Sequence, residues 1–142
     1  MSSSESLAEL VLEQTAEAVV YANQKGIIER WNAAAAAMFG YSAAEALGQS
    51  LDLMIPEHLR KGHWRGFDAA IASGKTRLGG RPTLTRGQHK SGQKLYVEMS
   101  FALVLDSTGS ALGSVAVARD VTERVERKKA ASAAAAGGVA GT

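Results

Sequence analysis

The segment LYVEMSFALVL, residues 95–105, decides the fold class because large apolar side chains recur at every second position. These residues are Leu95, Val97, Met99, Phe101 and Leu103. On a β-strand, residues two apart lie on one face, so the pattern predicts a long strand with one side against a core. The turn residues at 106–109, DSTG, and the apolar run at 112–118 predict a further strand that returns beside it.

Three more strands are expected upstream of this pair. Residues 18–22, AVVYA, and 27–31, IIERW, predict a hairpin closed by the turn NQKG at 23–26. Residues 76–85 predict a strand interrupted by Gly79 and Gly80, and residues 88–92 predict the turn that follows it.

Short helices are predicted between the first two strands and the last three. Asn32 is placed to cap a helix over 33–39, and Ser42 to cap another over 43–47. A longer helix follows Pro56 and ends at Ser73. The element order predicts an α+β fold, with an antiparallel sheet and helices packed on one face.

The chain divides into three parts by its pattern. Residues 1–15 predict an N-terminal flanking helix, capped by Ser3 or Ser4, with Leu7, Leu10 and Val11 on one side. Residues 16–124 form the domain. Residues 125–142 are expected to be a linker or flexible tail, because the run AASAAAAGGVAGT offers no large side chain to pack.

The predicted long helix spans the segment IPEHLRKGHWRGFDAAI at 55–71. Residues four positions apart lie on one side of it and form a stripe: Leu59, His63, Phe67 and Ile71. Such a stripe faces a core, and three of its members are apolar. A histidine there is either a hydrogen-bonded core residue or a metal ligand. His63 is therefore the first candidate for a functional residue.

Composition excludes several functions. The chain of 142 residues has no cysteine, so disulfides, thiolate metal sites and a flavin–cysteinyl adduct are impossible. No long apolar run spans a membrane, and the N-terminus lacks a secretory pattern, so we expect a cytoplasmic protein with no membrane partner. The net charge is +2, and the cations at 124–129 are typical of a solvated helix face rather than a nucleic-acid site. Enzyme motifs are absent, which predicts no catalysis.

Several motifs, in this order, resemble those of PAS domains: GII at 26–28, WNA at 31–33, FGY at 39–41, EALG at 45–48, LMIPE at 53–57 and RDVTER at 119–124. The resemblance covers roughly residues 10–124. It implies a five-stranded antiparallel sheet, a ligand cavity between sheet and helices, and flanking helices that transmit a signal and form a homodimer.

Within this family, residues 55 onward are most similar to the haem-binding PAS domains of oxygen-sensing histidine kinases of the FixL type. Aligned on IPE and Arg60, His63 falls on the position of the proximal haem ligand. The resemblance implies haem b, with Phe67 on the same helix stripe and Arg77 near the propionates. Met99 and Phe101 match apolar positions on the distal side, where a methionine sulfur can also ligate iron.

The chain departs from that type at two positions. Thr83 stands where the distal arginine is found, and Ala69 where a propionate-binding arginine is found. Arg81 lies two residues from Thr83, and it substitutes for the missing arginine only if the backbone bulges at Gly79 and Gly80. Gas or redox sensing through haem b on His63 is one hypothesis. A cofactor-free dimerisation module and a PAS domain for a small organic ligand are the alternatives.

Overall fold

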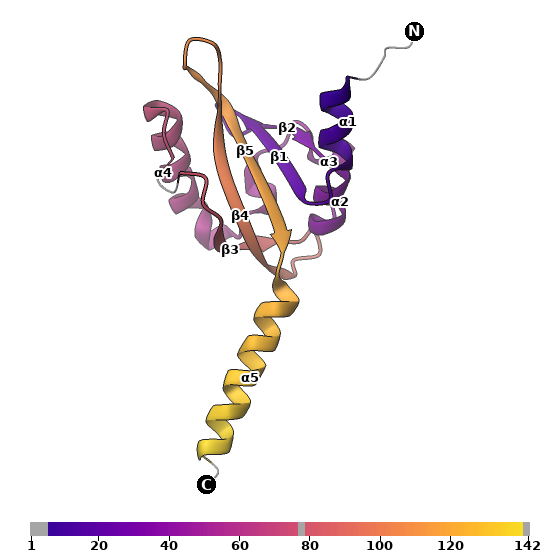
Figure 1. The fold of residues 1–142 in the computed structure, drawn as a ribbon, viewed down its shortest axis with the longest axis vertical. Coiled ribbons are helices and arrows are strands. Elements are labelled where there is room, and N and C mark those ends of the chain that lie inside the picture. Colours follow the sequence, from indigo (N-terminus) through magenta and orange to yellow (C-terminus); the bar gives the residue numbers. More distant parts are fainter. Residues whose placement is uncertain (1–5, 77–78, 141–142) are drawn as a thin grey trace.

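The computed structural model describes residues 6–76 and 79–140, and its centre is one antiparallel sheet (Figure 1). The strand order is β2 (Ile28–Trp31), β1 (Ala18–Asn23), β5 (Ala111–Asp120), β4 (Lys94–Leu105) and β3 (Thr83–Gln88). Each neighbouring pair is antiparallel. The predicted α+β class and five-stranded sheet are confirmed.

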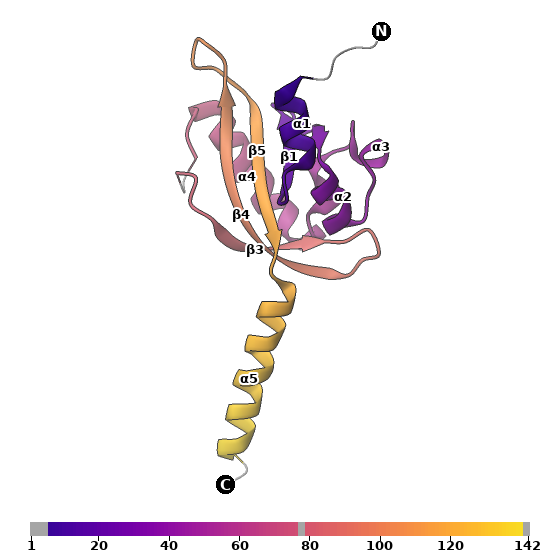
Figure 2. The same ribbon diagram turned by 45° about the vertical axis from the view of Figure 1, so that its right-hand side comes forward.

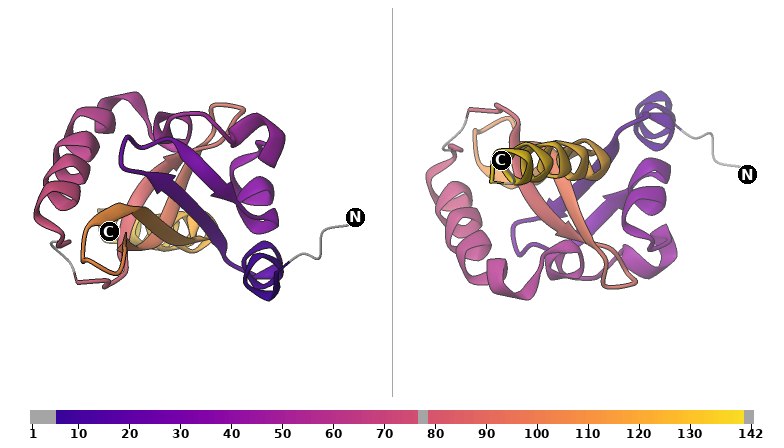
Figure 3. Two further views of the ribbon diagram at one scale, coloured as in Figure 1. Left: turned by 90° about the horizontal axis from the view of Figure 1, so that it is seen from above. Right: turned by 90° about the horizontal axis from the view of Figure 1, so that it is seen from below.

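The helices between β2 and β3 cover one face of this sheet. They are α2 (Ala33–Phe39), α3 (Ala43–Ala46), the 3-10 turn η1 (Leu51–Met54) and α4 (Glu57–Ser73). Seen along the long axis, α4 lies at one side and α2 and α3 at the other, with the strands between them (Figure 3). Two further helices flank the domain: α1 (Leu7–Gln14), which contacts α2, and α5 (Thr122–Ala140), which extends away from the body (Figure 2).

The core-facing side predicted along β4 is confirmed by packing, although burial itself does not alternate, because Tyr96 is also buried. Leu95 and Val97 are buried, and Met99 and Phe101 pack against the same core cluster. Apolar side chains from β1, η1 and α4 complete this cluster, which lies between the sheet and the helical layer. The inner face of β4 therefore forms one wall of whatever space the helices leave open.

Helix caps set where the short helices begin. The side chain of Asn32 accepts a hydrogen bond from Ala35 N, as predicted for the cap of α2. Ser42 and Glu45 form a reciprocal capping box at α3. Ser6 caps α1, whereas the predicted caps Ser3 and Ser4 lie outside the described residues.

The third strand lies further along the chain than predicted. It runs over Thr83–Gln88 rather than 76–85, because it pairs with Lys94–Met99 across a shorter turn. Gly79 and Gly80 both adopt positive φ, a turn conformation that ends any extended run before Thr83. Residues 77 and 78 lie outside the described part.

The C-terminal segment also differs from expectation. Where a linker was expected from residue 125, α5 continues as a helix to Ala140. Alanine has the highest intrinsic helix propensity, and the alanine run extends a helix that Val121 and Thr122 already anchor on β4. The proposed domain boundary near residue 124 thus falls inside a continuous helix.

Candidate functional site

An apolar cavity of about 350 Å³ lies between the inner face of the sheet and the helices. Val20, Val97, Met99, Phe101 and Ala116 line it from the strands; Phe39, Met54, Ile55, Leu59 and His63 line it from the helical side. Its size is that of a small-molecule site, since ligand pockets commonly measure ~300–1,000 Å³. The fold thus places a ligand-sized apolar space against the predicted stripe of α4.

His63 stands on the wall of this cavity. Its ring packs edge-on against Trp64 at 4.8 Å between centroids and is tilted against Phe67 at 5.9 Å. Its Nδ1 is buried, and within the described residues it has no hydrogen-bond partner. A buried polar atom without a partner is costly, so a group that bonds to this ring would remove an existing penalty.

Burial keeps the His63 imidazole neutral. It lowers the pKa of His63 below the ordinary value of 6.5, and the nearby carboxylates of Asp52 and Asp68 oppose that shift. A neutral imidazole has a nitrogen lone pair, which is the form that binds iron and other metals.

This pKa predicts how stability depends on pH. A histidine with a lowered folded-state pKa stabilises the fold fully above the unfolded pKa of about 6.5. That contribution is lost as the pH falls through about 6.5 toward the lower folded-state value. We expect urea melts of His63→Gln to lose less stability than the wild type between about pH 8 and about pH 5.5. His58→Gln is the control; if it removes the pH dependence equally, the assignment to His63 is wrong.

Two glycines flank His63 on α4. A Cβ added at Gly62 or Gly66 would meet nothing within 4 Å, so both positions border open space. A glycine inside a helix costs ~1 kcal/mol relative to alanine. Because the two glycines are four residues apart, they leave a bare strip of helix backbone on one side of the histidine, which lets a flat group approach α4 closely.

A second cavity of about 240 Å³ lies on the other side of His63. It is lined by Gly66, Phe67 and Ala70, and it shares Gly62, His63 and Phe101 with the core cavity. His63 and Phe101 thus form the partition between the two spaces. Changes in these two side chains would join the cavities into one larger site.

The position of α4 over the cavity is set by polar contacts with η1. Trp64 Nε1 donates to Asp52 Oδ1 at 2.7 Å, and Arg60 donates to the carbonyl oxygens of Ile55 and Asp52. The Trp64 ring also lies on the β1–β2 turn, where a Cβ on Gly26 would be 2.1 Å from it. These contacts hold the helix that carries His63 at a defined height above the sheet.

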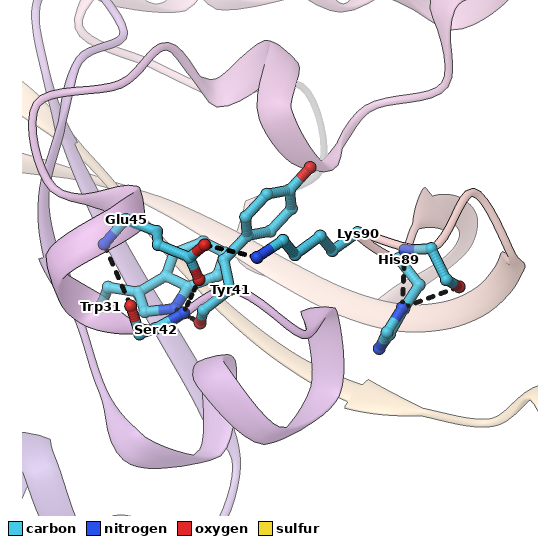
Figure 4. A network of polar contacts seen from close by, with 7 residues as sticks. Trp31, Tyr41, Ser42, Glu45, His89 and Lys90 are labelled. Carbon is cyan, nitrogen blue, oxygen red and sulfur yellow. Dashed lines mark hydrogen bonds and ion pairs between the residues drawn. The ribbon is translucent and has the colours of Figure 1, made fainter.

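Polar contacts attach the hairpin that joins β3 to β4 to the segment of α2 and α3 (Figure 4). Lys90 pairs with Glu45 of the α3 capping box, and its backbone N donates to the Phe39 carbonyl at 2.9 Å. The His89 ring lies against Gly40, where a Cβ would be 2.5 Å away. Phe39, a lining residue, is thereby fixed to the sheet.

The structure brings together part of the predicted site. His63, Met99 and Phe101 line one cavity, and Phe67 is buried and lines the adjoining one. Arg81 is exposed and lies outside the lining of both cavities. Arg77 lies outside the described residues.

Three polar residues on the cavity wall were missed from the sequence, and one of them is Arg86 on β3. Thr85 on β3 and the buried Ser114 on β5 both line the core cavity and offer hydroxyl groups to a ligand. Ser114 lies two and four residues before Ala116 and Ala118 on the same strand face, a period that marks it as inward-facing. The register of β3 was needed to find Thr85.

A family model described as the PAS fold matches residues 12–126, which is most of the chain. The chain belongs to the PAS family. PAS domains are in general sensory modules that carry ligands or cofactors in such a cavity.

Among the described residues, no three His, Asp or Glu side chains converge as a metal site, and no helix is long and apolar enough to span a membrane.

One sequence relative and two solved structures are similar to this chain. The PAS domain is 28% identical over 118 residues to the Oxygen sensor protein DosP of Escherichia coli K12, which covers 83% of this chain but 14% of that protein. A PAS domain from Colwellia psychrerythraea has a TM-score of 0.71 at 20% identity, covering 82% and 95% of the two chains. An RNA-binding Light-Oxygen-Voltage receptor has the same TM-score at 24% identity, covering 92% and 36%. The structural likenesses show the fold alone.

Proposed function

We propose that this PAS domain is a sensor module that holds haem b through His63. The observation that carries the proposal is His63 on the wall of an apolar cavity. Burial lowers its pKa, and its buried Nδ1 has no hydrogen-bond partner among the described residues. The sequence similarity to an oxygen sensor protein supports the same function.

The residues present fit such a group in four respects. The cavity is apolar, as haem pockets are, and one histidine suffices as protein ligand because the porphyrin supplies the other nitrogen ligands. Gly62 and Gly66 leave α4 bare beside the ligand position. A porphyrin exceeds the core cavity alone, but the adjoining cavity past His63 and Phe101 supplies further space.

Haem, when bound, supplies an iron that takes diatomic gases or changes redox state. The chain's residues define that environment. His63 stays neutral and offers a ring nitrogen, whereas Met99 and Phe101 on β4 keep the space apolar. Thr85 and Ser114 would offer hydroxyl groups to such a ligand from the sheet side of the cavity. Met99 is also a candidate second ligand through its sulfur.

The signal would leave through the sheet. Met99 and Phe101 lie on the strand whose outer residue Tyr96 hydrogen-bonds to the start of α5. A change in how the β4 side chains pack against the ligand would shift the population of two arrangements of α5 on the sheet.

The test is an absorption spectrum of the full chain after incubation with haem. We expect a Soret band with one haem per chain, and we expect His63→Ala to abolish it while His58→Ala leaves it unchanged. Because His63→Ala opens space at the ligand position, added imidazole should restore a Soret band to this variant only. An unchanged spectrum and stoichiometry in His63→Ala would overturn the ligand assignment.

A cofactor-free dimerisation module is the second candidate. Leu7 and Val11 on α1 are 76% and 57% exposed, and an amphipathic helix with an exposed apolar side commonly packs against a partner. We propose a homodimer through the flanking helices in either case, in a cytoplasmic protein without nucleic-acid or membrane partners. A colourless protein that sediments as a dimer and takes up no haem would favour the second function. Uptake of a flavin or another organic ligand would favour the third candidate function, a PAS domain that binds a small organic ligand.

A further inference from the structure

A group of cations surrounds the ring of Tyr96 on β4, and one of them, Arg86, also borders the His63 cavity. The Arg86 guanidinium carbon lies 5.8 Å from the centroid of the Tyr96 ring, Lys94 Nζ lies 5.7 Å from it, and Lys129 Nζ lies 4.6 Å from it. Arg86 and Tyr96 are paired across β3 and β4, and Lys129 comes from α5. Three separate elements therefore place positive charge at one point.

These charges are not neutralised within the described part of the chain. No carboxylate there forms an ion pair with Arg86, Lys94 or Lys129. The Arg86 Nε is moreover buried and lacks a hydrogen-bond partner. Three like charges held together repel one another, and an unpaired buried N–H donor adds a further penalty. An anion that bonds to this donor would relieve both.

A cleft of about 230 Å³ opens beside two of the three cations. Arg86, Gln88 and Lys94 line it from the β3–β4 hairpin, and Pro56, Glu57 and His58 line it from the start of α4. The donors in this set outnumber the one carboxylate, that of Glu57, which pairs with neither cation across the cleft. The first turn of α4 has no side-chain cap, so its positive end adds to the same field.

We propose that this cleft binds an oxyanion, specifically the phosphate group of a small soluble molecule, through Arg86 and Lys94. A guanidinium and an ammonium side by side match the several acceptor oxygens and double charge of a phosphate. The Gln88 amide supplies an additional donor on the same strand face. The cleft adjoins the core cavity, because Arg86 and Gly87 line both spaces, whereas Gln88 and Lys94 line the cleft alone.

Binding of an anion in the cleft would affect α5 through Tyr96, which bonds to the start of that helix. The Tyr96 backbone carbonyl accepts from Val121 N at 2.9 Å, its N donates to Thr122 Oγ1 at 2.9 Å, and its hydroxyl bonds to Lys129. The same cations, Lys129 foremost, lower the pKa of the Tyr96 phenol. A bound anion offsets their charge, so the pKa of Tyr96 should rise toward its ordinary value.

The test is an amide NMR titration of the full chain with sodium pyrophosphate against sodium chloride at equal ionic strength. Saturable shifts are expected at Arg86, Lys94, Tyr96 and the first turn of α5. Arg86→Gln and Lys94→Gln should each weaken pyrophosphate binding about tenfold, the size expected for one charge-assisted hydrogen bond. In the same titration, the Tyr96 pKa should rise in the wild type and stay unchanged in these variants.

Lys128→Gln is the matched control, since it removes one positive charge from α5 at a side chain that makes no contact with the Tyr96 ring. It should bind pyrophosphate as the wild type does. Thermal melts verify that each variant folds. Linear shifts equal to those with chloride would overturn the proposal, as would equal affinities for wild type, Arg86→Gln and Lys94→Gln. Binding only to anionic lipid vesicles and not to pyrophosphate would overturn the choice of a soluble ligand.

Discussion

Asn32→Ala is expected to lower the free energy of unfolding by ~3–5 kcal/mol, because it leaves several buried backbone groups without partners at once. Asn32 is 2% exposed. Its Oδ1 accepts from Val19 N and Ala35 N, both at 2.9 Å. Its Nδ2 donates to the carbonyl oxygens of Leu12 and Glu17 at 2.9 and 3.0 Å. One side chain thus joins α1, β1 and α2.

Urea unfolding monitored by circular dichroism measures this loss of stability. The variant Asn32→Asp separates the contribution of the acceptor Oδ1 from that of the donor Nδ2. An aspartate keeps the acceptor for Val19 N and Ala35 N but loses the donor to the carbonyl oxygens of α1 and the segment after it. We expect it to retain the fold with α1 released from the body, seen as faster amide exchange in α1 alone. A loss below ~1 kcal/mol in Asn32→Ala would show that water replaces these bonds at little cost.

Gly113→Ala is the second change expected to have a large effect, a loss of ~3 kcal/mol or more through forced displacement of the strands. A Cβ on Gly113 would lie 2.1 Å from the Ala22 carbonyl oxygen and 2.7 Å from the Tyr21 hydroxyl. The first of these is backbone, so no rotamer change relieves it. Gly113 pairs with Asn23 on β1 and Val104 on β4, and the clash therefore separates β5 from β1.

Gly62→Ala provides the matched control for this substitution. A Cβ there meets open space on α4, and alanine has the better helix propensity, so we expect a gain of ~0.5–1 kcal/mol. Thermal melts of both variants give the comparison. If the melting temperature of Gly113→Ala lies within a few degrees of that of the wild type, β1 and β5 can move apart at little cost and this prediction is wrong.

The elements with a strong period were predictable from the sequence. The alternation of β4 and the turns around it fixed the second half of the sheet, and the fourfold stripe of α4 placed His63 on the helix side that faces the core. Combined with the family resemblance, these two patterns brought His63, Met99 and Phe101 to one cavity. The period of the apolar residues shows which side of a helix or strand faces the core, but it does not show what chemistry the residues on that side perform.

Other features depend on contacts between distant residues. β3 is an edge strand that lacks a clear alternation, because its buried position is Gly87, whose missing side chain makes room for Phe39. Asn32 was predicted as a helix cap, but its bonds to carbonyl oxygens 15 and 20 residues earlier required the fold. The second cavity beside His63 arises only where α4 and β4 meet, and no local pattern indicates it.

The length of α5 gives its attachment to Tyr96 a mechanical consequence. A helix of 19 residues at about 1.5 Å per residue is about 28 Å long, and it leaves the domain as a single projecting rod (Figure 1). A tilt of ~10° where Val121 and Thr122 meet β4 would move its far end by about 5 Å, roughly one helical turn. A small rearrangement where α5 meets the sheet would therefore become a displacement of its far end comparable with the rise of one helical turn.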